Sequence, residues 1–225
     1  MEAGDGRIGV EAGSRRVRLF TVAVLVLLTL VTGVLIGRTT APAEAAPTPS
    51  STSAEAGFAR DMQAHHNQAV EMAILIRDRS DDDELRLLAL DIITAQSQQA
   101  GQMYAWLTAW NLPQTSSDPP MAWMSQPTLD GSMTGMDHGG GAMASTEMPG
   151  MASSEDVQRL RDADGVEAER IFLELMIAHH RGGMDMAEAL LARSDNALIA
   201  PLAQSIVMLQ QKEIDYMTKL LAERS

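Results

Sequence analysis

The 225-residue sequence contains no cysteine. A disulfide framework, a thiolate metal site and a thiol nucleophile are therefore excluded, and any metal chemistry must use histidine, methionine and carboxylates. Positive charge is also scarce, because 17 Lys and Arg residues stand against 30 Asp and Glu residues and the net charge is −13. This balance argues against a nucleic-acid-binding surface.

Two sequence patterns are absent as well. No segment shows the alternation of apolar and polar residues that is typical of half-buried strands, which favours an all-α fold. No Glu-x-x-His motif occurs, whereas a di-iron carboxylate site in a four-helix bundle needs two of them and Glu on all four helices. The sequence therefore predicts a binding protein rather than an enzyme of that class.

One long charge-free run is present, at residues 19–36 (LFTVAVLVLLTLVTGVLI), directly after Arg15, Arg16 and Arg18. It predicts a membrane-targeting segment, with residues 1–18 in the cytoplasm and the rest of the chain outside. We favour a retained single-pass anchor, whereas the small residues at 41–46 (APAEAA) leave secretion after signal cleavage as the alternative. Residues 37–54 are rich in Pro, Ala, Ser and Thr and are expected to form a tether.

Residues 55–225 are predicted to form one helical domain. Helical periodicity indicates a first hairpin at 55–110, with Ser80 to Asp83 (SDDD) capping its second helix. A Met- and Gly-rich linker at 111–153 and a short helix at 154–164, capped by Ser154, lead to a second hairpin at 166–223.

The two hairpins are copies of one unit. A shift of 114 residues aligns residues 58–107 with 172–221 without a gap, and 16 of the 50 positions are identical. Neither hairpin can bury its apolar face alone, so the copies are expected to pack together as a four-helix bundle.

Each copy carries a Met-x-x-His-His motif. At 100° per residue, the motif and a further Met fall within one stripe about 120° wide, whereas Glu71 and Asp185 lie on the opposite side. The candidate metal ligands on these two buried stripes are Met62, His65, His66, Met72, Met176, His179, His180 and Met186.

Four of the five histidines would thus point into the bundle interior. A buried polar group without a partner costs on the order of 1 to 3 kcal/mol, so we expect a shared partner, most simply a metal ion. Gln96, Gln210 and Glu213 are expected to orient the ring N–H groups. The alternative is a set of core imidazoles that bind no metal.

Thioether and imidazole donors suit Cu(I), and imidazole also suits Cu(II) and Zn. A copper ion is therefore the predicted cofactor, with another soft or borderline transition metal as the alternative. Seven Met residues between positions 121 and 151 extend the donor set. The possible linker ligands are Met133, Met136, His138, Met143, Met148 and Met151. A low-complexity linker is the other interpretation, and Trp123 with Met124 can instead fold back to cap the bundle.

The sequence resembles the bacterial proteins grouped as domain of unknown function 305. The resemblance rests on FARDMQAHHNQAVEMA at 58–73, FLELMIAHHRGGMDMA at 172–187, the helices ending in Met103 and Met217, and MPGM before SSEDVQRL. It implies a ferritin-like helical bundle, secreted or membrane-anchored and associated with copper. Two departures are Gly182-Gly183, which either loosens the helix or allows closer packing, and Gln99 where the second copy has Glu213.

The predicted function is extracytoplasmic copper binding, buffering or delivery, without catalysis. A ferritin-like metal-dependent oxidase and a metal-free structural or signalling module are the alternatives, and in the latter the histidines would bond one another or respond to pH. The expected partners are the metal ion and the cytoplasmic membrane. A copper-handling protein and a second copy of the chain are left open.

Overall fold

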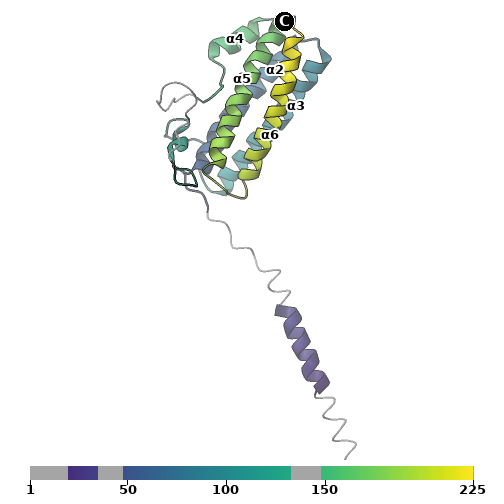
Figure 1. Cartoon of the computed structure of the whole chain (residues 1–225), viewed down its shortest axis with the longest axis vertical. Coiled ribbons are helices and arrows are strands. Elements are labelled where there is room, and N and C mark those ends of the chain that lie inside the picture. Colours follow the sequence, from purple (N-terminus) through teal and green to yellow (C-terminus); the bar gives the residue numbers. More distant parts are fainter. Residues whose placement is uncertain (1–19, 35–47, 133–147, 225) are drawn as a thin grey trace, which may run out of the picture. The chain divides into compact units, whose positions relative to one another are not determined.

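The computed structural model describes residues 20–34, 48–132 and 148–224, and divides the chain into two units, Met1–Pro47 and Thr48–Ser225 (Figure 1). The first unit contains a helix at 20–34. No helix among the described residues is long and apolar enough to cross a bilayer. The predicted segment at 19–36 extends past the described residues at both ends, and the expectations for 1–18 and for most of the tether also lie outside them.

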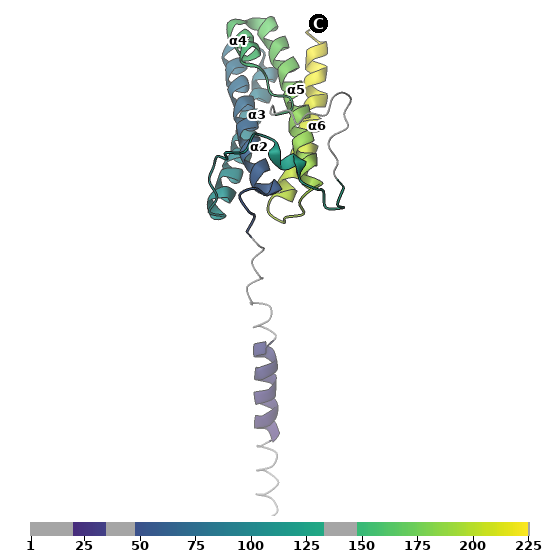
Figure 2. The ribbon, with the colours of Figure 1, turned by 90° about the vertical axis from the view of Figure 1, so that its left-hand side faces the viewer.

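All regular secondary structure in the described ranges is helical, which confirms the all-α prediction. The elements of the second unit are α2 (Ala54–Arg79), α3 (Asp83–Ala109), the 3₁₀ helix η1 (Ala122–Ser125), α4 (Ser154–Asp162), α5 (Gly165–Leu191) and α6 (Ala200–Ala222). Helix α2 packs against α3, α5 packs against α6, and α2 joins the two hairpins by packing against α5. Figures 1 and 2 show these four long helices side by side, with α4 at the end where the C-terminus lies.

Short polar side chains set the helix starts. Ser53 caps α2 by accepting a hydrogen bond from the Ala56 N–H, and the Asp82 carboxylate caps α3. Ser153, rather than the expected Ser154, caps α4. The compact unit begins at Thr48, ahead of the expected boundary at residue 55, because the Arg60 guanidinium donates to the carbonyl and hydroxyl of Ser51.

The loop of each hairpin is hydrogen-bonded to the first helix of the other hairpin. Ser80, in the loop of the first hairpin, donates to the Glu169 carboxylate at 2.5 Å, and Ser194, in the loop of the second, donates to the Glu55 carboxylate at 2.5 Å. Both the serines and the glutamates are separated by 114 residues, the offset of the repeat. The bundle therefore has an approximate two-fold relation between its halves.

Arg224 adds a bond that has no equivalent in the first copy. Its Nε lies 2.6 Å from a Glu169 carboxylate oxygen and its Nη2 lies 2.8 Å from Asp82. The Arg224 and Glu169 side chains are both 8% exposed. This buried ion pair ties the end of α6 to the start of α3 and α5.

Two apolar clusters make up the core. The first cluster gathers around Met72, Ile92, Phe172, Met176 and Met217, and the second around Phe58, Met62, Met103, Met186 and Ile206. These side chains are all 0% exposed. The histidines of the two motifs belong to neither cluster and form a polar layer in the bundle core.

Candidate metal centre

The imidazole layer consists of His65, His66, His179 and His180. All four side chains are 0% exposed, as the buried stripes predict. The first pair lies on α2 and the second on α5, the two helices that join the hairpins. The structure therefore brings the two repeated motifs together in one buried layer.

The imidazoles of His65 and His179 lie face to face where the two halves meet. Their ring centroids are 3.7 Å apart and their planes are inclined by 32°. The second histidine of each pair lies further away, with centroid distances of 6.4 Å from His65 to His66 and 6.5 Å from His179 to His180. The layer is thus a close central pair with one imidazole beside each member.

Two of the imidazoles have a fixed tautomer. His65 Nε2 lies 3.1 Å from the Pro149 carbonyl oxygen, and His180 Nε2 lies 2.8 Å from a Glu213 carboxylate oxygen. A carbonyl and a carboxylate only accept, so each Nε2 donates, and in the neutral ring each Nδ1 then keeps its lone pair. Both Nδ1 atoms are buried and have no hydrogen-bond partner. A metal-binding histidine usually has this arrangement, with one nitrogen held and the other free.

Further buried polar atoms in the interior have no partner. Both ring nitrogens of His66 and of His179 lack a well-formed hydrogen bond, as do the side-chain amides of Gln96 and Gln210. The Gln99 side chain and the His65 backbone are nevertheless close enough to raise the pKa of His66 and of His179, respectively, against the effect of burial. Of the three residues expected to orient the imidazoles, only Glu213 is hydrogen-bonded to one. No three His, Cys, Asp or Glu side chains in the described ranges already form a set that could hold an ion. The imidazole nitrogens of the layer and the thioethers of the motifs on the same helices are donors that suit a soft cation.

Burial favours the neutral form of three of these imidazoles, those of His65, His66 and His179. It lowers the pKa of His65 to about 4 and that of His66 to about 3, and it lowers the pKa of His179 well below 6.5. The positive charge of a neighbouring imidazole would lower each pKa further. A neutral imidazole is the form that binds a metal ion.

The methionines of the motifs lie in the two apolar clusters. Met62 and Met186 belong to one cluster, and Met72 and Met176 to the other. All four are 0% exposed. Of the possible linker ligands, Met148 and Met151 are half-buried, while Met133, Met136, His138 and Met143 lie outside the described residues.

A strap formed by Met148–Ala152 covers one side of the imidazole layer. Its Pro149 carbonyl accepts from His65, and the Gln68 amide binds both the N–H and the carbonyl of Ala152. Gly182 gives the strap room, because a Cβ there would lie 2.0 Å from the Pro149 carbonyl oxygen. Pro149 could not be predicted from the sequence, since a backbone carbonyl leaves no mark on side-chain patterns. The glycine pair of the second copy was the available signal.

Gly182→Ala is expected to push the strap off the bundle and to cost about 1 to 3 kcal/mol of stability, the usual range for overpacking. Urea denaturation measures the loss, and faster proteolytic cleavage within 148–152 would show that the strap has moved. Gly101→Ala is the control, because a Cβ on Gly101 meets nothing within 4 Å. That helical substitution should be stabilising. Equal effects of the two variants would contradict the assigned role of Gly182.

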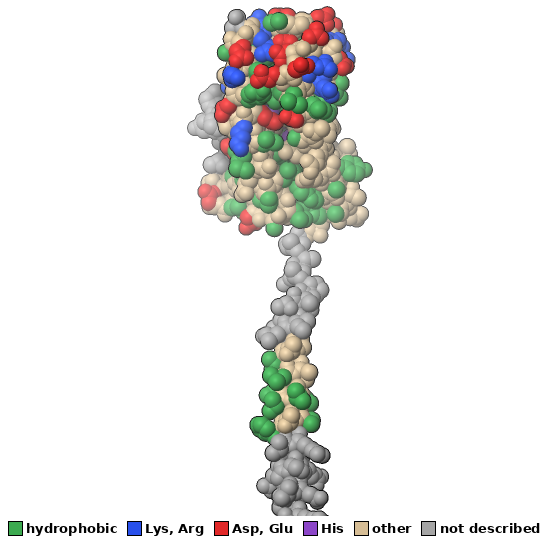
Figure 3. Space-filling model, turned by 90° about the vertical axis from the view of Figure 1, so that its right-hand side faces the viewer, with side chains coloured by type: hydrophobic (Ala, Val, Ile, Leu, Met, Phe, Trp, Pro, Cys, Tyr) green, Lys and Arg blue, Asp and Glu red, His purple; other side chains and the backbone are tan. Residues whose placement is uncertain are grey.

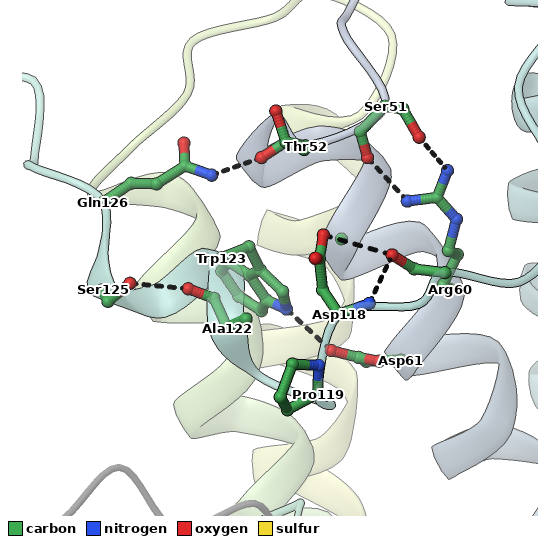
Figure 4. A pocket seen from close by; sticks show the side chains of 12 residues that line it. Ser51, Thr52, Arg60, Asp61, Asp118, Pro119, Ala122, Trp123, Ser125 and Gln126 are labelled. Carbon is green, nitrogen blue, oxygen red and sulfur yellow. Dashed lines mark hydrogen bonds between the residues drawn. The ribbon is translucent and has the colours of Figure 1, made fainter.

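A polar pocket of about 240 Å³ beside the start of α2 has a structural role (Figure 4). The Asp61 carboxylate accepts hydrogen bonds from the Met121 N–H and from Trp123 Nε1–H. Burial raises the pKa of Asp61, and these two bonds oppose the rise. The Trp123 ring packs edge-on against Phe58. The prediction that Trp123 folds back onto the bundle is confirmed, and the charged groups here are already paired.

Solved structures with this fold are known. A protein from Streptomyces coelicolor, classed as secreted, is 45% identical, with a TM-score of 0.67 over 78% of this chain and 96% of its own. A fragment from Deinococcus radiodurans is 31% identical, with a TM-score of 0.60 over 79% of this chain and 99% of its own. CopM in its Cu(I)-bound form is 22% identical, with a TM-score of 0.55 over 76% of this chain and 96% of its own, and shares the fold.

No curated protein matches the sequence significantly. The family model described as domain of unknown function (DUF305) matches residues 55–221, which include both hairpins, the strap and all four buried histidines. The chain therefore belongs to the DUF305 family.

Proposed function

We propose that this protein binds copper outside the cytoplasm and buffers or delivers it, with the imidazole layer as the metal site. One observation carries the proposal: His65 and His180 are each held at Nε2 by an acceptor, so that a lone pair on Nδ1 stays free in the core. An interior that bound nothing would leave these nitrogens, together with those of His66 and His179, buried without partners. Such groups are costly in a protein core.

The donor set supports copper over other metals. The proposed ligands are the imidazoles of the layer with thioethers drawn from Met62, Met72, Met176 and Met186. Mixed imidazole and thioether donors suit Cu(I), whereas Mg, Ca and Mn prefer oxygen. Structures of CopM, a protein with the same fold, hold Cu(I), Cu(II) or Ag. A copper ion bound here would bring positive charge into the imidazole layer.

An oxidase function is less well supported. Among the described residues, Glu213 is the one carboxylate that bonds an imidazole of the layer, so the carboxylate-rich donor set of di-iron enzymes is missing. The basic, apolar N-terminal sequence and the secreted class of the 45% identical relative support an extracytoplasmic location. Retention of the 19–36 segment as an anchor stays a prediction from the sequence.

Anaerobic titration of the full-length protein with Cu(I), in competition with a chromogenic chelator, tests the proposal. The wild type is expected to compete, and the double variant His65→Ala/His180→Ala should lose affinity by about tenfold or more, equivalent to about 1.4 kcal/mol. Far-UV circular dichroism checks that the variant is folded.

His138→Ala separates the imidazole layer from the possible linker ligands, because His138 is the one histidine outside the two motifs. It should leave most of the affinity in place. A double variant that binds Cu(I) like the wild type, or an equal loss on replacing His138, would show that the metal site is not the imidazole layer.

A further inference from the structure

A pocket of about 200 Å³ lies between α3 and α6, the two long helices that do not join the hairpins. Helix α3 contributes Glu84 and Asp91 to its lining, and α6 contributes Lys212, Glu213 and Tyr216. Figure 3 looks onto this side of the bundle and shows histidine atoms beside acidic side chains. The four imidazoles lie behind this lining and are 0% exposed.

Glu213 connects this pocket with the imidazole layer. Its side chain is 14% exposed and lines the pocket, while its carboxylate lies 2.8 Å from Nε2 of the fully buried His180. The strap closes another side of the layer at His65. Glu213 is thus a single side chain that reaches from a surface pocket to the candidate ligands.

The charged side chains that line the pocket are mostly acidic. Three carboxylates, those of Glu84, Asp91 and Glu213, face one lysine, Lys212. Tyr216 donates its hydroxyl to Glu84 at 2.5 Å and so links α6 to α3 at this pocket. No three acidic or imidazole groups in the described part of the chain form a ready-made chelate.

A second observation points inward from the same helix. Gln210, one turn before Glu213, is 3% exposed, and neither its amide oxygen nor its amide nitrogen has a hydrogen-bond partner. Its amide lies where a Cβ on Gly183 would meet it, and the same Cβ would lie 3.2 Å from the His65 ring. A buried amide without a partner thus lies one turn from Glu213 and close to His65 in the interior.

We propose that the pocket between α3 and α6 is the entrance through which a monovalent soft cation, Cu(I) or Ag(I), reaches the imidazole layer, and that Glu213 receives the cation there. The inference rests on the proposed function. The entrance is one-sided, because the first copy has the uncharged Gln99 at the position that corresponds to Glu213. One half of the bundle therefore admits the metal and the other does not.

Stopped-flow transfer of Cu(I) from its bicinchoninate complex to the metal-free full-length protein tests the entrance. Glu213→Gln should slow loading by about tenfold, the lower end of what a focused charge does to an association rate. Its equilibrium affinity should fall by less than its loading rate, because the glutamine amide oxygen still accepts the His180 N–H. Gln99→Glu, which places a carboxylate at the matching position of the first copy, should speed loading.

Glu188→Gln is the charge-matched control, since it removes one negative charge from an exposed position on α5. The proposed entrance would be refuted if Glu213→Gln loaded Cu(I) as fast as the wild type, or if it slowed loading no more than Glu188→Gln does. A loss of equilibrium affinity as large as the loss of rate would also overturn it, because Glu213 would then only position His180. A wild-type protein that takes up no Cu(I) would refute the proposed function itself.

Discussion

Acidifying the metal-free protein from pH 7 to pH 4 is expected to remove several kcal/mol of its free energy of unfolding. The pKa of His65 in the folded protein is about 4 and that of His66 is about 3, and the pKa of His179 is also lowered by burial. In the unfolded chain each returns to about 6.5. Between these values the unfolded state binds more protons than the folded state, so stability falls as the pH falls.

Each such histidine contributes a slope that approaches about 1.4 kcal/mol per pH unit between pH 6.5 and its folded pKa. Stability is fully present above pH 6.5 and is lost progressively below it. Urea denaturation at pH 7, 6, 5 and 4, followed by circular dichroism, measures the slope. His66→Leu should reduce the slope by about one histidine's share. A midpoint that stays constant from pH 7 to pH 5 would show that the imidazoles are not neutral and buried.

Arg224→Ala is expected to destabilise the bundle by about 3 to 5 kcal/mol, the usual cost of removing one partner of a buried ion pair. The Arg224 guanidinium contacts the carboxylates of Glu169 and Asp82, and its Nη1 donates to the Leu220 carbonyl. Without it, the Glu169 carboxylate stays buried with only the Ser80 hydroxyl as a donor. Thermal and urea denaturation of the metal-free protein measure the loss.

The control for Arg224 is an exposed ion pair. Arg161 lies 2.9 Å from Glu71, and the two side chains are 46% and 50% exposed. Arg161→Ala should cost less than about 1 kcal/mol, because solvent screens such pairs. If the two arginine variants lose the same stability, the Arg224 network contributes no more than a surface contact.

The repeat made most of the fold predictable. Residues that recur after 114 positions, such as His65 and His179, must occupy equivalent places in both hairpins. The 3.6-residue period then put both histidine pairs on buried faces, and the structure places all four at 0% exposure. The duplication provides a check on the prediction, because an error in the helical phase would have to occur in both copies.

The parts of the site that depend on tertiary contacts could not be predicted. The strap reaches His65 through the carbonyl of Pro149, 84 residues away, and no periodic pattern encodes such a contact. Gln96 and Gln210 share the inward stripe with the histidines, yet their amides bond nothing. A helical wheel fixes the direction of a side chain but not its partner. For the same reason, the sequence does not reveal that Ser80 and Ser194 each bond a glutamate of the other hairpin.

The reciprocal bonds of Ser80 with Glu169 and of Ser194 with Glu55 have the form of an isologous interface, in which each partner gives the other what it receives. A symmetric dimer of identical hairpins would carry Glu213 twice or not at all, since every substitution appears in both subunits. Fusion into one chain removes that constraint. The bundle can keep the matched bonds that close it while one half gains a carboxylate, and the other a glutamine, at the same structural position. Covalent linkage of the two hairpins therefore permits an asymmetric entrance in an otherwise symmetric bundle.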